Sequence, residues 1–223
     1  MKLYYAPASS YSQRVLIALY EKDIAFKPIE VNLFNPKACA SYMKINPFAK
    51  IPTLVTDSGE VLFETCVIIE HLDQTFQNQP HLIPLDPERA LAVRMLERII
   101  DVYINGGREV LFADTQRPVK ERGSKEVVKA KRLLEIACVW LDEQLQGRTW
   151  LTGQEFSLAD CAAAPTLNYL RMVYSYKHLK KLTDYVRRIG SRASVALVQR
   201  QGRDQLQQML SELQYPLELA PLE

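Results

Sequence analysis

Three serines near the start of the chain, Ser9, Ser10 and Ser12, lie at the turn into an expected helix. The start of a helix carries unpaired N–H groups and a partial positive charge, which lower the pKa of a thiol placed there. A serine hydroxyl at that place can also donate a hydrogen bond to the sulfur. The same serines can act simply as helix N-caps, which is the common use of serine at such positions.

A second polar constellation lies between residues 46 and 72. Pro52 enters an expected short strand, and the acid Glu64 and the hydroxyl of Thr65 open an expected helix. This layout places exposed backbone at Ile51 beside a polar helix start. Together these groups could hold the amine and carboxylate ends of a small peptide.

The pattern of apolar residues predicts the elements that position these groups. Expected strands cover residues 2–6, 26–33, 53–56 and 60–63. Expected helices cover residues 12–21 and 64–76, with a short helix that begins at Asn35-Pro36 and ends near Asn46-Pro47. The order is therefore βαβ, then α, then ββα.

Strand signals stop after the proline-containing segment 77–87, which predicts a linker. Expected helices then cover about 86–105, 124–145, a stretch after Ser157, 182–189 and 194–199, and the tail from Tyr215 is expected to be irregular. Ser157-x-x-Asp160 resembles a capping box with Asp in place of Glu or Gln. The pattern predicts an α/β domain over 1–78, a linker over 79–88 and an all-α domain over 89–223.

Composition and charge exclude several classes of protein. The formal net charge of +2 gives no argument for nucleic-acid binding. The four cysteines form no C-x-x-C pair and the three histidines are scattered, so no metal site is expected. Met1 leads directly into a strand pattern and no apolar run approaches membrane-spanning length. We expect a cytoplasmic protein with no membrane partner.

Four blocks of the sequence, in this order and spacing, resemble the cytosolic glutathione transferases. They are P-A-S-S-Y-S-Q-R-V-L-I-A-L (7–19), N-P-F-A-K-I-P-T-L (46–54), F-E-T-C-V-I-I-E-H-L (63–72) and F-S-L-A-D (156–160). The first block resembles the serine-type classes phi and zeta, and A-D-C-A-A-A-P (159–165) is also zeta-like. The resemblance covers nearly the whole chain. It implies a bacterial-type member with a thioredoxin-like N-terminal domain and an all-helical C-terminal domain.

The resemblance implies that Ser9 is the catalytic residue that stabilises the glutathione thiolate. Ser10 is a rival, because it falls where the beta class carries a cysteine. Tyr5 is another, because it falls where the tyrosine-type classes carry their catalytic tyrosine. Since neither position 9 nor position 10 is a cysteine, thiol-disulfide reductase activity is not expected.

The same resemblance implies how glutathione is held. Pro52 matches the family's cis-proline, which turns the Ile51 backbone toward the cysteinyl part of the peptide. Glu64 and Thr65 match the pair that binds the γ-glutamyl end, and Lys50 and Lys37 match positions that touch the glycyl carboxylate. The expected glutathione-binding set is Ser9, Ser10, Lys37, Lys50, Ile51, Pro52, Glu64 and Thr65.

A co-substrate pocket is expected between the two domains. Its candidate residues, from their positions along the chain, are Tyr11, Tyr103, Gly107 and Phe112. Tyr11 departs from the zeta pattern, in which a cysteine stands between two serines, and this departure argues against maleylacetoacetate isomerase activity.

The resulting functional hypothesis is a detoxifying glutathione S-transferase, a homodimer that joins glutathione to a small electrophile. Two alternatives remain. The first is a glutathione-dependent isomerase of the maleylacetoacetate type, or a peroxidase, on the same site. The second is a non-catalytic binding protein with the glutathione transferase fold. The natural electrophile has no motif in the sequence.

Overall fold

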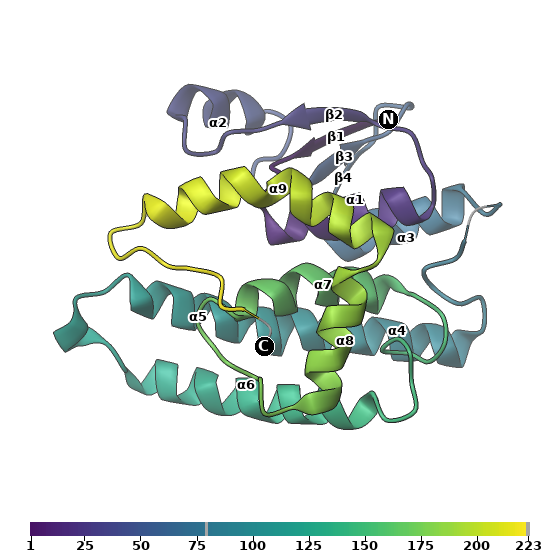
Figure 1. Ribbon diagram of the computed structural model, residues 1–223. Helices are drawn as coiled ribbons and strands as arrows, with labels where there is room; N and C mark the ends of the chain where they lie inside the picture. Colours follow the sequence, from purple (N-terminus) through teal and green to yellow (C-terminus); the bar gives the residue numbers. More distant parts are fainter. Residues whose placement is uncertain (79, 222–223) are drawn as a thin grey trace.

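The computed structural model describes residues 1–78 and 80–221. Residue 79, where the predicted linker begins, and residues 222 and 223, where the predicted second domain ends, lie outside the described part. Figure 1 shows a sheet at the top, a layer of long helices at the bottom, and helices from both halves of the chain between them.

Four short strands form one mixed sheet in the order β2-β1-β3-β4. They are β1 (Lys2–Tyr5), β2 (Lys27–Glu30), β3 (Thr53–Val55) and β4 (Val61–Phe63). β1 runs parallel to β2 and antiparallel to β3, and β3 runs antiparallel to β4. Pro28 lies in β2, which is a strand at the edge of the sheet. Proline has no backbone N–H to donate to a neighbouring strand, and this is tolerated at a sheet edge.

The helices of this first half are α1 (Ser10–Glu21), α2 (Pro36–Tyr42) and α3 (Thr65–Thr75). α1 is buried on nearly all sides, because α3 contacts it within its own domain and two helices of the second domain also contact it. A helix so enclosed is apolar around most of its surface, as the run from Val15 to Leu19 is. The predicted βαβ-α-ββα order is confirmed.

The second half is all-helical, as predicted. Its elements are α4 (Pro87–Ile99), the π-helical turn η1 (Ile100–Asn105), α5 (Gly106–Thr115), the short 3₁₀ turn η2 (Val119–Glu121), α6 (Lys125–Gln144), α7 (Leu158–Leu170), α8 (Lys180–Gly190) and α9 (Ala193–Ser211). α7 forms the centre of this domain, with twelve of its thirteen residues buried. No helix among the described residues has the length and hydrophobicity needed to cross a membrane.

Two helices extend beyond their predicted ends. The helix expected over about 86–105 continues through η1 into α5, where Gly107 packs directly against Leu134 of α6. The helix expected over 194–199 runs to Ser211, because the polar stretch after Gln199 still presents apolar residues to the rest of the protein at Leu206 and Leu210.

The predicted capping box at the start of α7 is confirmed and carries additional bonds. One carboxylate oxygen of Asp160 accepts the Ser157 N–H and the Ser157 hydroxyl, both at 2.9 Å. The other accepts the Leu151 N–H at 3.1 Å and the Tyr185 hydroxyl at 2.7 Å. Asp160 is fully buried, so this carboxylate ties three segments of the helical domain together.

Ion pairs and hydrogen bonds, most of them partly buried, join the two domains. Arg14 of α1 donates to Asp101 of η1 at 2.8 Å and to Thr166 of α7 at 2.9 Å. Glu21 at the end of α1 accepts two hydrogen bonds of 2.6 Å from Arg192, just before α9. These contacts fix the first helix, and the serines at its start, against the helical domain.

Candidate functional site

Ser9 is the N-cap of α1, at the end of the turn that follows β1. Its hydroxyl oxygen accepts the Ser12 N–H at 3.2 Å, and its own N–H donates to Ala6 at 3.0 Å. The Ser9 O–H proton has no acceptor among the described hydrogen bonds and can be donated to a ligand. The first N–H groups of α1 have no partner within the helix, so they add to the positive potential at this point.

Side chains from three helices hold the turn that carries Ser9. Gln205 of α9 accepts the Ala8 N–H at 2.8 Å, and the Tyr169 hydroxyl of α7 donates to the Ala8 carbonyl at 3.0 Å. Gln13 of α1 donates to the Pro7 carbonyl at 2.9 Å and to the Tyr169 hydroxyl at 3.0 Å. The backbone before Ser9 is therefore fixed largely by the second domain, which sequence patterns do not reveal.

Gly202 permits the close approach of α9 to this turn. A Cβ atom at position 202 would lie 2.4 Å from the Pro7 carbonyl oxygen and 2.9 Å from Gln13 Nε2. The clash is with backbone, so a side-chain rotation cannot relieve it. α9 and the turn can touch only because residue 202 has no side chain.

We expect Gly202→Ala to lower the free energy of unfolding by about 1–3 kcal/mol, because it overpacks a contact that cannot adjust locally. Gly106→Ala is the matched control: a Cβ there meets nothing within 4 Å, and alanine favours a helix. Urea unfolding of both variants tests the contact. Equal stability of the two variants would mean that the contact between α9 and the turn has room for a methyl group.

The strand register places the polar groups of segment 46–72 at the same end of the sheet as the turn that carries Ser9. Tyr4 of β1 is opposite Thr53 of β3, and Thr53 is opposite Phe63 of β4. The turn after β1, Pro52 before β3 and Glu64 after β4 therefore meet at one sheet edge. The predicted glutathione-binding residues of the turn, the proline loop and the α3 start are adjacent for this reason.

The Ile51–Pro52 peptide bond is cis, as the resemblance implies. The loop before it is fixed by the Lys50 carbonyl, which accepts the Tyr42 hydroxyl at 2.6 Å and the Asn46 amide at 2.9 Å. Among the described residues, the N–H and the C=O of Ile51 make no hydrogen bond. Both groups can pair with an extended ligand at the sheet edge.

Glu64 has an unusual backbone conformation, with φ of 72° and ψ of 119°. A residue other than glycine with positive φ costs about 1–3 kcal/mol and is concentrated at functional sites. Its side chain is exposed and makes no capping bond to α3, whereas Thr65 beside it is buried. The carboxylate is therefore free to meet a ligand cation. Lys37 on α2 and Lys50 before Pro52 are exposed.

A cavity of about 330 Å³ opens between the turn and the helical domain. Ser9 and Ser10 lie at its wall, and Phe112 of α5, a candidate residue of the co-substrate pocket, also lines it. Its other lining residues were not predicted: Ala8, Arg108, Glu109, Tyr169, Met172, Leu206, Met209, Leu210 and Leu213. Four of these follow the helical spacing 206, 209, 210 and 213, a signal that could have identified the apolar wall of the cavity.

The other predicted pocket residues lie outside the cavity lining. The Tyr11 hydroxyl accepts the Asn105 amide at 2.8 Å, its ring packs on the Arg14 guanidinium, and burial raises the pKa of Tyr11 to about 12. Tyr103 is half exposed on η1, and Gly107 faces Leu134. Tyr11 and Gly107 thus have packing contacts of their own.

The rivals of Ser9 differ in position. Ser10, the first residue of α1, is buried and lines the same cavity. Tyr5 does not line it; its hydroxyl is 3.5 Å from Glu30, and burial is the main reason that the pKa of Tyr5 is raised. A tyrosine with a raised pKa and an anionic partner is a poor stabiliser of a second anion.

The cysteines offer no reactive thiol at the cavity wall. Burial raises the pKa of Cys138 to about 12 and that of Cys161 well above its ordinary value. Cys39 and Cys66 are half-buried and unpaired. In the described part of the chain, no group of three or more His, Cys, Asp or Glu residues could hold a metal ion.

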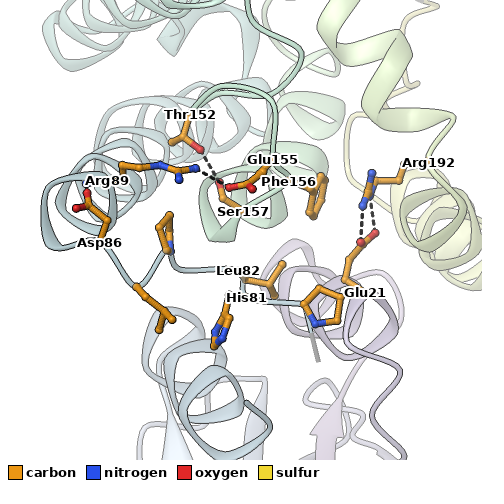
Figure 2. Close-up of a pocket in the computed structure, with 13 residues that line it drawn as sticks. Glu21, His81, Leu82, Asp86, Arg89, Thr152, Glu155, Phe156, Ser157 and Arg192 are labelled. Carbon is orange, nitrogen blue, oxygen red and sulfur yellow. Dashed lines mark hydrogen bonds and ion pairs between the residues drawn. The ribbon is translucent and has the colours of Figure 1, made fainter. Parts of the chain in front are cut away.

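A larger cavity of about 540 Å³ lies where the segment before α4 meets the start of α7 (Figure 2). Four of its charged side chains form two pairs: Arg89 bonds Glu155, and Arg192 bonds Glu21. None of the predicted site residues lines it. The smaller cavity beside Ser9 is therefore the better candidate for catalysis.

Comparisons with known proteins agree with the fold. Residues 3–80 match the family model "Glutathione S-transferase, N-terminal domain", and residues 131–188 match "Glutathione S-transferase, C-terminal domain". A "Stringent starvation protein A homolog" of Coxiella burnetii is 32% identical, over 75% of this chain and 74% of that protein. "Glutathione S-transferase F10" of Arabidopsis thaliana is 30% identical, over 85% and 92%.

A solved structure of a glutathione S-transferase is also similar to this chain. A glutathione S-transferase from Methylobacillus flagellatus, crystallised with glutathione bound, superimposes with a TM-score of 0.78. It is 30% identical in sequence, and the match covers 88% of this chain and 98% of that structure.

Proposed function

The chain belongs to the glutathione S-transferase family, and from that premise we propose that it joins the glutathione thiolate to a small electrophile. Glutathione would lie along the sheet edge with its sulfur at Ser9. The electrophile would enter the apolar cavity beside it. The sulfur lone pair would form the new bond to carbon, the leaving group of the electrophile would depart with its bonding pair, and the thiol proton would leave to solvent.

The observation that carries this proposal is that three groups able to pair with a peptide meet at one end of the sheet. The Ile51 backbone can pair with the cysteinyl unit, and Glu64 can take the ammonium of the γ-glutamyl end. Ser9 stands where the thiol would then point, between this edge and the cavity. The enzyme would contribute thiolate formation and orientation of the two reactants.

Membership of the family does not by itself imply catalysis. One relative, "FtsZ-localized protein A" of Caulobacter vibrioides, is 30% identical over 75% of this chain, and its name describes no reaction. A non-catalytic binding protein is therefore the second candidate. The cavity at Ser9 favours catalysis, because a protein that only bound a partner would have no use for space beside the thiol.

Calorimetry with glutathione tests the proposed binding site. We expect wild-type protein to bind glutathione and Glu64→Gly to bind it at least about tenfold more weakly, since a charge-assisted hydrogen bond is lost. Glycine tolerates the positive φ at position 64, so this variant should fold at least as stably as the wild type. Lys131→Ala, at an exposed position on α6, is the control.

Conjugation of glutathione to 1-chloro-2,4-dinitrobenzene then separates the two candidate functions. Turnover supports the transferase. Tight glutathione binding without turnover of this compound, of a peroxide or of maleylacetoacetate would support the binding protein. Absence of glutathione binding would contradict the proposal as a whole.

We also propose a cytoplasmic homodimer. The four cysteines are free, as in proteins of reducing compartments. Exposed apolar side chains form a stripe along α4 and η1, at Leu91, Met95 and Val102, and Val67 is exposed on α3. Such a patch suits a partner surface. Sedimentation of the protein at twice the monomer mass would support the dimer, and the monomer mass would contradict it.

A further inference from the structure

One cation lines the cavity beside Ser9. Arg108, in the first turn of α5, has a side chain that is only 11% exposed. Burial is the main reason that the pKa of its guanidinium is lowered, although an arginine stays charged at any physiological pH. A nearly buried cation is costly unless anions or acceptors compensate it.

Arg108 uses little of its hydrogen-bonding capacity within the described protein. Its Nε–H donates to Asn105 at 3.0 Å, and its Nη2 lies 3.5 Å from a carboxylate oxygen of Glu109. No hydrogen bond from Nη1 or Nη2 is present among the described residues. Arg14, by contrast, donates from both of these atoms and faces two carboxylates.

Glu109 compensates Arg108 only in part. Its side chain is 57% exposed, so solvent screens its charge, and it also accepts a hydrogen bond from Asn105 at 3.2 Å. Arg108 therefore keeps a pair of donors with the planar geometry that suits a second carboxylate.

The rest of the cavity is largely apolar. Six side chains from α5, the end of α7 and the region of α9 supply this surface: Phe112, Met172, Leu206, Met209, Leu210 and Leu213. A ligand that fits has an apolar body and one acidic group. Ser9 and Arg108 line the same cavity, so such a ligand would be anchored beside the expected position of the thiolate.

We propose that the co-substrate of this protein is a carboxylic acid with an apolar or aromatic body, whose carboxylate binds to the guanidinium of Arg108. The reaction of this acid with glutathione rests on the proposed function, whereas the binding of the acid to Arg108 does not. Arg108 would position the electrophile and take no part in bond making. Glu109, as a competing anion, would weaken the binding.

Binding is tested with an unreactive matched pair, 3,5-dinitrobenzoate and its methyl ester, by calorimetry. We expect the wild type to bind the acid roughly tenfold or more tightly than the ester, the gain of a charge-assisted bidentate contact. Arg108→Met should abolish this preference and change ester binding less than about threefold, because the apolar wall remains. Arg108→Lys should retain part of the preference, and Glu109→Gln should increase it.

Arg132→Met, at an exposed position on α6, is the control for loss of a positive charge and should leave both affinities unchanged. If Arg108→Met does not fold, the Lys and Gln variants still decide the question. Equal wild-type affinity for acid and ester would overturn the inference. So would a preference for the acid that Glu109→Gln and Arg108→Lys both leave unchanged.

A reactive pair then separates this inference from the proposed function: 4-chloro-3,5-dinitrobenzoate and its methyl ester. In each, the glutathione sulfur forms a bond to the carbon that carries chlorine, and chloride leaves with the bonding pair. Preference for the acid in kcat/KM, lost in Arg108→Met, supports both proposals. Selective binding of the dinitrobenzoate without turnover would contradict the transferase and support the acid site. Turnover of both compounds at rates that Arg108→Met does not change would support the transferase and contradict the acid site.

Discussion

Replacing Asp160 with alanine is expected to lower the free energy of unfolding by about 3–5 kcal/mol, because four buried donors lose their acceptor. These donors are the N–H groups of Leu151 and Ser157 and the hydroxyls of Ser157 and Tyr185. Asp160 is fully buried, so water cannot replace the carboxylate without opening the domain. In thermal unfolding, the midpoint should fall by roughly 10 °C.

Asp184→Ala is the matched control for this substitution. Asp184 lies half exposed on α8 and pairs with Arg187 one turn away, so its loss should change stability by less than about 0.5 kcal/mol. Urea unfolding at constant pH compares the two variants. Similar losses in both would show that the capping network contributes little, and that the start of α7 is held by apolar packing alone.

Ser9→Ala is expected to lower kcat/KM for glutathione conjugation by roughly 8- to 25-fold at pH 7. The thiol of free glutathione, with a pKa of about 8.5, is mostly protonated at that pH, and a donor at the helix start shifts it toward the thiolate. If the shift is about one to two pKa units, its loss reduces the thiolate fraction at pH 7 by about 8- to 25-fold, because the fraction saturates once the pKa falls below the pH. The pH–rate profile should therefore move to higher pH in the variant.

Controls at neighbouring positions separate catalysis from capping. Ser9→Ala also removes an N-cap and should cost about 1 kcal/mol of stability. Ser10→Ala and Tyr5→Phe address the rival assignments and should retain most of the activity. A Ser9→Ala enzyme that is less stable but fully active would reduce Ser9 to a cap. Loss of activity only in Ser10→Ala would transfer the catalytic role to Ser10.

The residues that sequence reasoning located are those whose role follows from their neighbours along the chain. A capping box is a local pattern over four residues, and Ser157-x-x-Asp160 is found in the structure as predicted. The order of the elements along the chain follows from the pattern of apolar residues, and the cis bond before Pro52 follows from a block of sequence that resembles a known family. Such features need no knowledge of tertiary contacts.

The features that were missed depend on contacts between distant segments. Gly202 reads as a helix breaker in sequence, yet in the structure it allows α9 to touch the Pro7 backbone. The positive φ of Glu64 has no local signature, because its residue type does not favour that conformation. Arg108 is one of many arginines in the sequence, and only the fold buries it in a cavity with unused donors.

The central claim is that Ser9 and the start of α1 stabilise the thiolate of bound glutathione. Its most direct test is a titration of the bound thiol by ultraviolet difference absorbance in the wild type, Ser9→Ala and Ser10→Ala. We expect a pKa about one to two units below the free value of about 8.5 in the wild type and in Ser10→Ala, and a return toward 8.5 in Ser9→Ala. A pKa that Ser9→Ala leaves unchanged, with glutathione still bound, would contradict the claim.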